Sequence, residues 1–248
     1  LLSRRQRQMC IRDSPALVEQ LRAGFAWQYP AAALAGVPAK VSVTSIVHKA
    51  EQTTLERPGF LSKDGLTAAE MGTALHAFLE HADFARLAEA KAAGTLDTAI
   101  PAERDRQVAV QLTAPEIAEK LDAVCIRRFV ESEAFAKICA AQQVLRELAF
   151  ITALPAAEVL AAQGSPAPDT APEAQVLVQG IADLVLVYPD HLELLDYKTD
   201  RRKTAADFVR AYKPQLDLYA LAVGKRFAPK PVTYKGIYSL ELGRLIEV

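Results

Sequence analysis

The chain has 248 residues, 51% of them apolar and 24% charged, and its formal net charge is −1. This composition is sufficient for one large packed domain, and the near-neutral charge gives no sign of a globally basic protein. No apolar run approaches the roughly 18 residues of a membrane span, and no apolar segment follows the basic N-terminus as in a secretory signal. Three cysteines without CxxC spacing argue against a zinc or iron–sulfur site and suit a reducing cytoplasm.

Residues 1–14, LLSRRQRQMCIRDS, contain four arginines and one acid. A DNA-binding arm is one interpretation. The segment also resembles translated sequencing-adapter read-through, which we favour, so we expect a non-native tail. Residues 15–58 are expected to form a connector with a short helix at about Ala16–Ala26 and an extended segment within KVSVTSIVHK. The main domain is then expected at residues 59–248.

A helix is predicted to begin near Thr67, because Thr67 and Glu70 have capping-box spacing, and to continue through MGTALHAFLEHADFARLAEA. Gly72 inside this helix would allow another backbone to approach closely. His76 borders the apolar stripe of the helix. A single histidine in that position is more often a hydrogen-bonded core residue than a ligand. A second helix is predicted to begin at Pro115 and to cover APEIAEKLDAVCIRRFV.

Residues Val144–Thr152 have strand character, although Glu147 interrupts the apolar pattern; charges of an edge strand would explain this equally well. Residues 153–175 are rich in alanine and proline and are predicted to be a partly disordered surface insertion.

Two strands joined by a tight turn are predicted at Val176–Tyr188 and Leu192–Thr199, because both are rich in Val, Leu and Ile and Pro189-Asp190 lies between them. A four-residue loop places Val187 opposite Leu192. Counting back along the antiparallel pair then places Asp183 opposite Asp196, with Lys198 on the same face.

Two directly opposed carboxylates destabilise a sheet unless a cation lies between them or one of them is protonated. Magnesium and manganese prefer carboxylate oxygens, and a neighbouring lysine could hold a water molecule or a phosphate. We therefore favour a metal site at Asp183, Asp196 and Lys198 over a solvated surface pair. A register slip of one residue would remove this site.

A helix is predicted from about Thr204 or Ala205, with Gln215 and Tyr219 as i,i+4 neighbours. The region after the hairpin is basic and could follow a phosphate backbone or form a solvated helix face. Closing strands are expected at Val232–Ser239 and Leu245–Val248. No phosphate-binding loop of the G-x-x-x-x-G-K-[ST] type occurs.

The blocks GTALH, RELAF, GIADLVLV, LLDYKTD and QLDLYALAV occur in the order typical of RecB-type nuclease domains of the PD-(D/E)XK superfamily. The chain resembles most closely the C-terminal nuclease domain of AddA-type helicase/nuclease proteins, over about Tyr29–Val248. The resemblance implies an α/β fold with a mixed central sheet flanked by helices. One departure is Ala149, where the family usually has proline.

The resemblance also implies roles for matching residues. It implies Mg²⁺ or Mn²⁺ as cofactor, with His76, Asp183 and Asp196 as ligands and the carbonyl of Tyr197 as a possible fourth. Lys198 would be the catalytic lysine and Glu147 an auxiliary acid of the site. Gln215 and Tyr219 would support the site and the DNA backbone. The cysteines that hold an iron–sulfur cluster in AddB-type relatives are absent.

The function implied is a metal-dependent DNA exonuclease domain that hydrolyses single strands during double-strand-break repair. Residues 15–58 would then connect it to an ATP-driven helicase part, and an AddB-like protein would be the partner. Two alternatives remain: a non-catalytic DNA-clamping domain of a repair complex, which the presence of Asp183, Asp196 and Lys198 disfavours, and a stand-alone RecB-like exonuclease.

Overall fold

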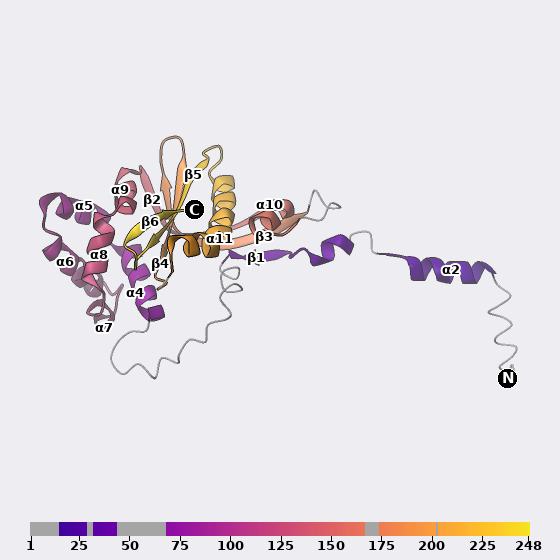
Figure 1. Ribbon diagram of the computed structural model, residues 1–248, viewed down its shortest axis with the longest axis horizontal. Helices are drawn as coiled ribbons and strands as arrows, with labels where there is room; N and C mark the ends of the chain where they lie inside the picture. Colours follow the sequence, from indigo (N-terminus) through magenta and orange to yellow (C-terminus); the bar gives the residue numbers. More distant parts are fainter. Residues whose placement is uncertain (1–14, 29–31, 44–67, 167–173, 202) are drawn as a thin grey trace.

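The computed structural model describes residues 15–28, 32–43, 68–166, 174–201 and 203–248 (Figure 1). The predicted tail at residues 1–14 and the predicted helix cap at Thr67 lie outside these ranges. The strands are β1 (Lys40–Ser42), β2 (Gln143–Pro155), β3 (Gln175–Val187), β4 (Leu192–Lys198), β5 (Val232–Ser239) and β6 (Arg244–Glu247). The helices before the long hairpin are α2 (Pro15–Ala26), η1 (Ala32–Gly36), α4 (Ala68–His81), α5 (Phe84–Ala93), α6 (Leu96–Ala109), α7 (Pro115–Ala118), α8 (Ala123–Glu131) and α9 (Glu133–Ala140). Two further helices are α10 (Ala156–Ala162) and α11 (Ala205–Arg226).

The strands form one mixed six-stranded sheet in the order β1-β3-β4-β5-β6, with β2 also paired to β3. β3 is antiparallel to β2 and β4, whereas β4 and β5 are parallel. The parallel pair requires a crossover connection, and the 22-residue helix α11 provides it. The predicted α/β fold with a mixed, helix-flanked sheet is confirmed.

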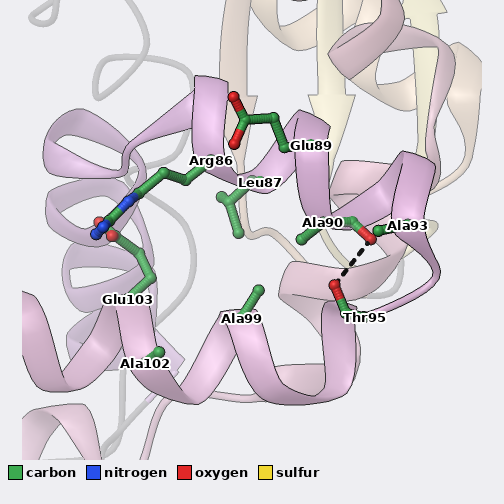
Figure 2. Close-up of a pocket in the computed structure, with 9 residues that line it drawn as sticks. All are labelled: Arg86, Leu87, Glu89, Ala90, Ala93, Thr95, Ala99, Ala102 and Glu103. Carbon is green, nitrogen blue, oxygen red and sulfur yellow. Dashed lines mark hydrogen bonds between the residues drawn. The ribbon is translucent and has the colours of Figure 1, made fainter.

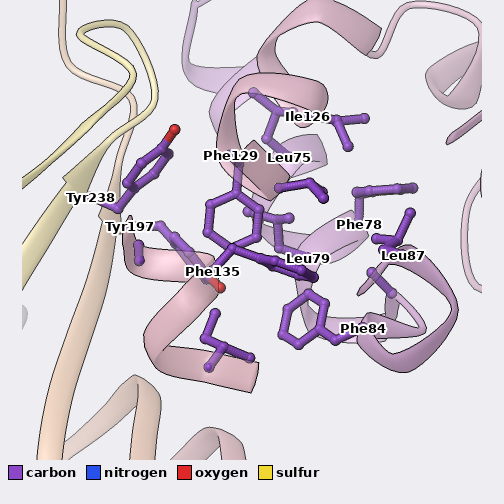
Figure 3. Close-up of a cluster of buried hydrophobic side chains, with 14 of the residues drawn as sticks. Leu75, Phe78, Leu79, Phe84, Leu87, Ile126, Phe129, Phe135, Tyr197 and Tyr238 are labelled. Atoms are coloured by element: carbon purple, nitrogen blue, oxygen red, sulfur yellow. The ribbon is translucent and has the colours of Figure 1, made fainter. Parts of the chain in front are cut away.

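Each face of the sheet has its own apolar core. On one face, Leu184, Leu186 and Leu195 pack against the helices α4, α5, α6, α8 and α9. Aromatic rings dominate this core, in which Phe129 makes edge-to-face contacts with Phe135 and with Tyr197 (Figure 3). On the other face, α10 and α11 cover a second core that is rich in valine and leucine. The sheet is therefore buried on both sides, as the apolar character of the hairpin strands indicates.

The hairpin has the predicted register, because Val187 pairs with Leu192 and Leu184 with Leu195. The helices are shorter than predicted. Asp83 caps α5 by accepting a hydrogen bond from the amide of Arg86, so the helix expected to run from Thr67 through residue 90 is two helices. Asp122 caps α8 in the same way, which separates it from the four-residue helix α7. Both caps mark the start of a new helix because the aspartate side chain satisfies an amide of its first turn.

The structure corrects the expected insertion at residues 153–175. Residues 153–155 belong to β2, and Ala156, Val159 and Leu160 of α10 are buried in the core covered by α11. Residues 156–162 therefore form a helix that packs on the core through Ala156, Val159 and Leu160, and not a solvated loop. Residues 167–173 lie outside the described residues.

The expected connector also contributes to the fold. β1 pairs in parallel with β3, and Val41 and Val43 are buried in the second core. The sheet therefore includes residues before the expected boundary at residue 59. In contrast, α2 has no buried residue and lies apart from the sheet (Figure 1).

A cavity of about 400 Å³ lies between α5 and α6 (Figure 2). Its walls are largely alanine, and its one deeply buried charge, Glu103, is bound by Arg106 and Gln107. The described residues that line it include no convergent reactive groups. Across the described parts of the chain, no helix combines the length and the apolar character needed to cross a bilayer.

Candidate active site

The ladder between β3 and β4 ends just before the two predicted aspartates. Its last backbone pair is Leu184 with Leu195. Beyond this pair the carboxylate of Asp183 replaces the backbone, because its Oδ2 accepts a hydrogen bond from the amide of Tyr197 at 2.8 Å. Asp183 is thus fixed in the gap between the two strands, at the position that the register predicts, but without direct backbone pairing to Asp196.

β2 places Glu147 beside Asp183. Arg146 pairs with Leu184 and Leu148 with Ala182, so Glu147 lies across from Asp183 in an unshifted register. The backbone of Glu147 has φ 45°, in the left-handed region that non-glycine residues rarely adopt. Such strain persists where the surrounding structure enforces it, commonly at functional sites.

Both strands change their alternation at this pair. On β3, Ala182 packs in the core covered by α11, whereas Leu184 packs in the opposite core. On β2, Leu148 packs in the core under α11, whereas Arg146 reaches α4 on the other face. Residues two apart normally share a face. The break in both strands at Glu147 and Asp183 turns two acidic side chains out of the regular pleat toward a common point.

α4 supplies the third group. The Nδ1 atom of His76 lies 3.6 Å from Oδ2 of Asp183. Ligand atoms of His76, Glu147 and Asp183 all lie within 4.8 Å of one another. The sequence predicts Glu147 only as an auxiliary acid, but the structure places it in this cluster as closely as the other two.

Asp196 lies beside the cluster with its own partners. Its Oδ2 atom pairs with Nζ of Lys198 at 2.5 Å, and its Oδ1 atom accepts a hydrogen bond from Gln215 at 3.1 Å. Gln215 also donates to the hydroxyl of Tyr219 at 2.9 Å. Gln215 and Tyr219 are only 5% and 2% exposed. Gln215 contacts Asp196 directly and Tyr219 contacts it through Gln215, while the expected contact of both residues with DNA stays a prediction.

Burial dominates the electrostatics of the site. Burial raises the pKa of Asp183 and of Asp196 to about 6, against the opposing effect of the Lys198 charge. Burial also lowers the pKa of His76, and the charge of Lys198 lowers it further. Burial alone lowers the pKa of Lys198, but the charges of Asp196 and Asp183 raise it above its ordinary value. The site thus has excess carboxylate, a neutral imidazole and a charged lysine.

These groups fit a hard divalent cation. Carboxylate oxygens and a neutral histidine nitrogen are suitable donors, and buried carboxylates gain stability from a cation because water solvates them poorly. Aspartate and glutamate oxygens within 4.8 Å of a histidine nitrogen could share one ion. The ring of Tyr197 meets the imidazole of His76 edge-on, with ring centres 5.7 Å apart, so Tyr197 lies at the edge of the site.

α4 is fastened at its N-terminal end by a close approach. A Cβ atom on Gly72 would lie 2.5 Å from Oγ1 of Thr199, the residue after Lys198. The sequence indicates a close approach at Gly72, but to another backbone; the structure shows a side chain instead. Only glycine lets the helix that carries His76 lie this close to the end of β4.

Side chains from β2 and α6 fasten the C-terminal end of α4. Arg146, next to Glu147, donates to the carbonyls of Glu80 and Ala82 at 2.7 Å each, and its guanidinium lies 3.8 Å from the ring centre of Phe84. Arg106 of α6 donates to the carbonyl of His81 at 2.8 Å. Sequence reasoning missed Arg146; its proximity to Glu147 on an apolar strand was the available signal.

The basic region after the hairpin is largely engaged in structural contacts. Lys203, Arg210 and Lys213 pair with aspartates of the same region. Lys225 and Arg226 donate to the carbonyls of Ala153 and Ala149 in β2. These cations are a poor candidate for a continuous phosphate-binding face.

Comparison with known proteins agrees with this geometry. A profile described as "PD-(D/E)XK nuclease superfamily" matches residues 49–243. An ATP-dependent helicase/nuclease protein of the AddA type from Pelotomaculum thermopropionicum is 34% identical over 98% of this chain and 20% of its own length. The proteins of the same name from Bacillus velezensis and Moorella thermoacetica are 32% and 34% identical over 95% and 84% of this chain, and over 20% and 15% of their own lengths.

The chain belongs to the PD-(D/E)XK nuclease superfamily. Within that superfamily it is similar to AddA-type helicase/nuclease proteins, in the nuclease domain at their C-terminus. It spans 15–20% of the length of the curated relatives named above.

Proposed function

We propose that this domain is a nuclease that uses Mg²⁺ or Mn²⁺ to hydrolyse phosphodiester bonds of DNA. The observation that supports this most strongly is the convergence of His76, Glu147 and Asp183, next to the Asp196–Lys198 pair. His76, Asp183 and Glu147 would hold the cation, with Asp196 and the carbonyl of Tyr197 as further ligands. A divalent cation supplies Lewis-acid polarisation of the scissile phosphate and offsets charge on the leaving oxygen.

The protein groups have separate tasks in this mechanism. Lys198 is charged and can orient the attacking water or stabilise the negative charge that develops on the phosphoryl group. Its ammonium lies 4.8 Å from the ring centre of Tyr212, which restricts its position. Gln215 fixes the orientation of Asp196, and Tyr219 fixes Gln215. Preorganised charges of this kind lower the barrier because they need no rearrangement during the reaction.

The wider role follows from the relatives. We infer an exonuclease domain, acting on single strands from a duplex end, within a longer helicase–nuclease that processes double-strand breaks for recombinational repair. ATP would be used by the helicase part, and an AddB-like protein would be the partner in the cytoplasm. The similarity of this chain to helicase/nuclease proteins over 84–98% of its length supports this proposal over a stand-alone enzyme.

A clamp that binds DNA without cutting it is the second candidate. A domain with that role has no need for a charged lysine paired with a buried aspartate beside three candidate ligands. The intact set of Lys198, Asp196, Asp183 and His76 therefore favours the nuclease.

The test removes Lys198 and Asp196 separately in the full-length helicase–nuclease. Lys198→Ala should reduce single-strand cleavage by about 10²–10³-fold and leave metal binding largely intact, because it removes one stabilising charge. Asp196→Ala should lose cleavage and weaken metal binding together. Lys213→Ala, which removes a lysine paired with Asp217 on the outer side of α11, is the matched control. Normal cleavage by Lys198→Ala would contradict the catalytic assignment and favour the clamp.

A further inference from the structure

A second cavity, of about 430 Å³, lies where β4 ends. α4 lines it with Met71 and Leu75, the loop after β5 with Leu240, and the segment after β4 with Thr199. Thr199 directly follows Lys198, and Leu75 directly precedes His76. The cavity therefore adjoins the candidate active site along both the helix and the strand that build it.

Two arginines, Arg128 and Arg201, reach this cavity. No carboxylate of the described residues lies within 4.0 Å of either guanidinium, whereas Lys203, Arg210 and Lys213 are all paired. Among the described lysines and arginines of residues 201–213, Arg201 is thus the one without a carboxylate partner, and it is available for an anion.

Arg128 is held in place for such a contact. Its Nη1 atom donates to the carbonyl of Glu241 at 3.2 Å. Its stem fills the space beside Gly243, where a Cβ atom would overlap Cδ of Arg128. Gly243 has φ 64°, so the turn and the arginine both require glycine there. A fixed guanidinium binds a phosphate with less loss of side-chain freedom than a mobile one.

The remaining walls differ in character. Met71, Leu75 and Leu240 form an apolar surface, while Asp122 and Glu241 offer hydrogen-bond acceptors. The negative charges of the two acids offset the positive charges of the two arginines, so the whole cavity does not attract anions and only its arginine edge does. These walls match the parts of a nucleotide. The base would lie against the apolar surface, with its amino groups donating to the acids, and the phosphate would lie at the two arginines.

We propose that this cavity binds one nucleotide of the DNA strand, next to the bond that is cut, with its phosphate at Arg201 and Arg128. The proposal rests on the proposed function, because it takes the ligand to be the strand that the nuclease site cleaves. In this proposal the DNA strand is positioned by the cavity at the end of β4 and not by the paired cations Lys203, Arg210 and Lys213.

The experiment measures binding, so its result does not depend on cleavage. Short single-stranded oligodeoxynucleotides, each with one neutral methylphosphonate linkage at a different position, are titrated by fluorescence anisotropy into the full-length protein carrying Lys198→Ala. Arg201→Gln is added on this background. Arg210→Gln is the matched control, because Arg210 belongs to the same basic region but is paired with Asp207.

We expect one linkage whose neutralisation weakens binding by about ten-fold, as for loss of a charge-assisted contact. Arg201→Gln should weaken binding of the unmodified strand similarly, lower the slope of log affinity against log salt by about 0.7, and reduce the sensitivity at that linkage. Arg210→Gln should leave all three unchanged.

Equal behaviour of Arg201→Gln and Arg210→Gln would overturn the proposal, as would undiminished sensitivity to the same linkage after Arg201→Gln. If the cavity binds a side chain of a partner protein instead of DNA, Arg201→Gln and Arg210→Gln will behave equally. Failure of the nuclease proposal is detected separately, as absence of cleavage by the protein without these substitutions.

Discussion

At the scale of single residues, the site depends on a few side chains whose positions are enforced by unusual backbone or close packing. Glu147 adopts a left-handed conformation in the middle of a strand. Gly72 lies so close to Thr199 that a Cβ atom at this position would collide with its side chain. The hairpin turn is enough to predict that Asp183 and Asp196 come together. Family resemblance predicts Glu147 only as an auxiliary acid of the site. Its place among the candidate metal ligands could not be predicted from strand alternation, because regular alternation fails at this residue.

Gly72→Ala tests the close approach of α4 to β4. Alanine normally stabilises a helix interior by about 1 kcal/mol relative to glycine. Here its Cβ would meet Oγ1 of Thr199 at 2.5 Å, so we expect a net loss of about 1–3 kcal/mol in the free energy of unfolding. Chemical denaturation measures the change, and adding Thr199→Gly should restore most of it.

Gly224→Ala in α11 is the control, because the nearest atom to its Cβ position is 3.9 Å away. It should be neutral or stabilising by up to about 1 kcal/mol. Equal effects of the two substitutions would show that the contact with Thr199 is unimportant.

At the scale of elements, α4 is the part whose position the sequence predicts least well. The sequence indicates the helix, yet its placement depends on Arg146, Arg106 and Gln107, which bind its last carbonyls from β2 and α6. These contacts join residues 25 to 66 positions apart. Local patterns predict the strands and their hairpin well, since turn chemistry and apolar runs are local. They do not show which distant side chains cap a helix.

Glu103 gives this arrangement a pH dependence. It accepts hydrogen bonds from Arg106, Gln107 and the amide of Asp83, which together overcome the effect of burial and lower its pKa below the ordinary 4.5. A carboxyl group whose pKa is lower in the folded state stabilises the fold above its unfolded pKa, and this contribution is lost as pH falls through the folded pKa.

Thermal melts between pH 3 and pH 7 should therefore show the protein losing stability relative to Glu103→Gln as the pH falls below about 4.5. Glu89→Gln, at an exposed position on α5, should follow the unsubstituted protein. A constant difference between Glu103→Gln and the unsubstituted protein over this range would show that the charge on Glu103 does not stabilise the fold.

At the scale of the whole molecule, the sheet separates two cores. The candidate metal ligands and Lys198 come together where β2, β3 and β4 meet α4. α11 supports this point from one face through Gln215, and the helical layer supplies His76 from the other. The fold class, and the convergence of most residues of the candidate site, could be predicted from the sequence, because the motifs lie on regular elements. The helical content of residues 156–162 could not, because burial of Val159 and Leu160 depends on α11, far along the chain.

The most direct test of the account is a Mn²⁺ titration of the full-length protein by calorimetry, comparing Asp183→Asn with Asp217→Asn. Asp217 of α11 is bound by Lys213 and Lys235 and is outside the cluster. We expect Asp183→Asn to weaken metal binding by more than the roughly 10–100-fold typical of losing an outer-shell partner, and Asp217→Asn to leave it unchanged. Metal binding that is unaffected by Asp183→Asn would contradict the proposed site.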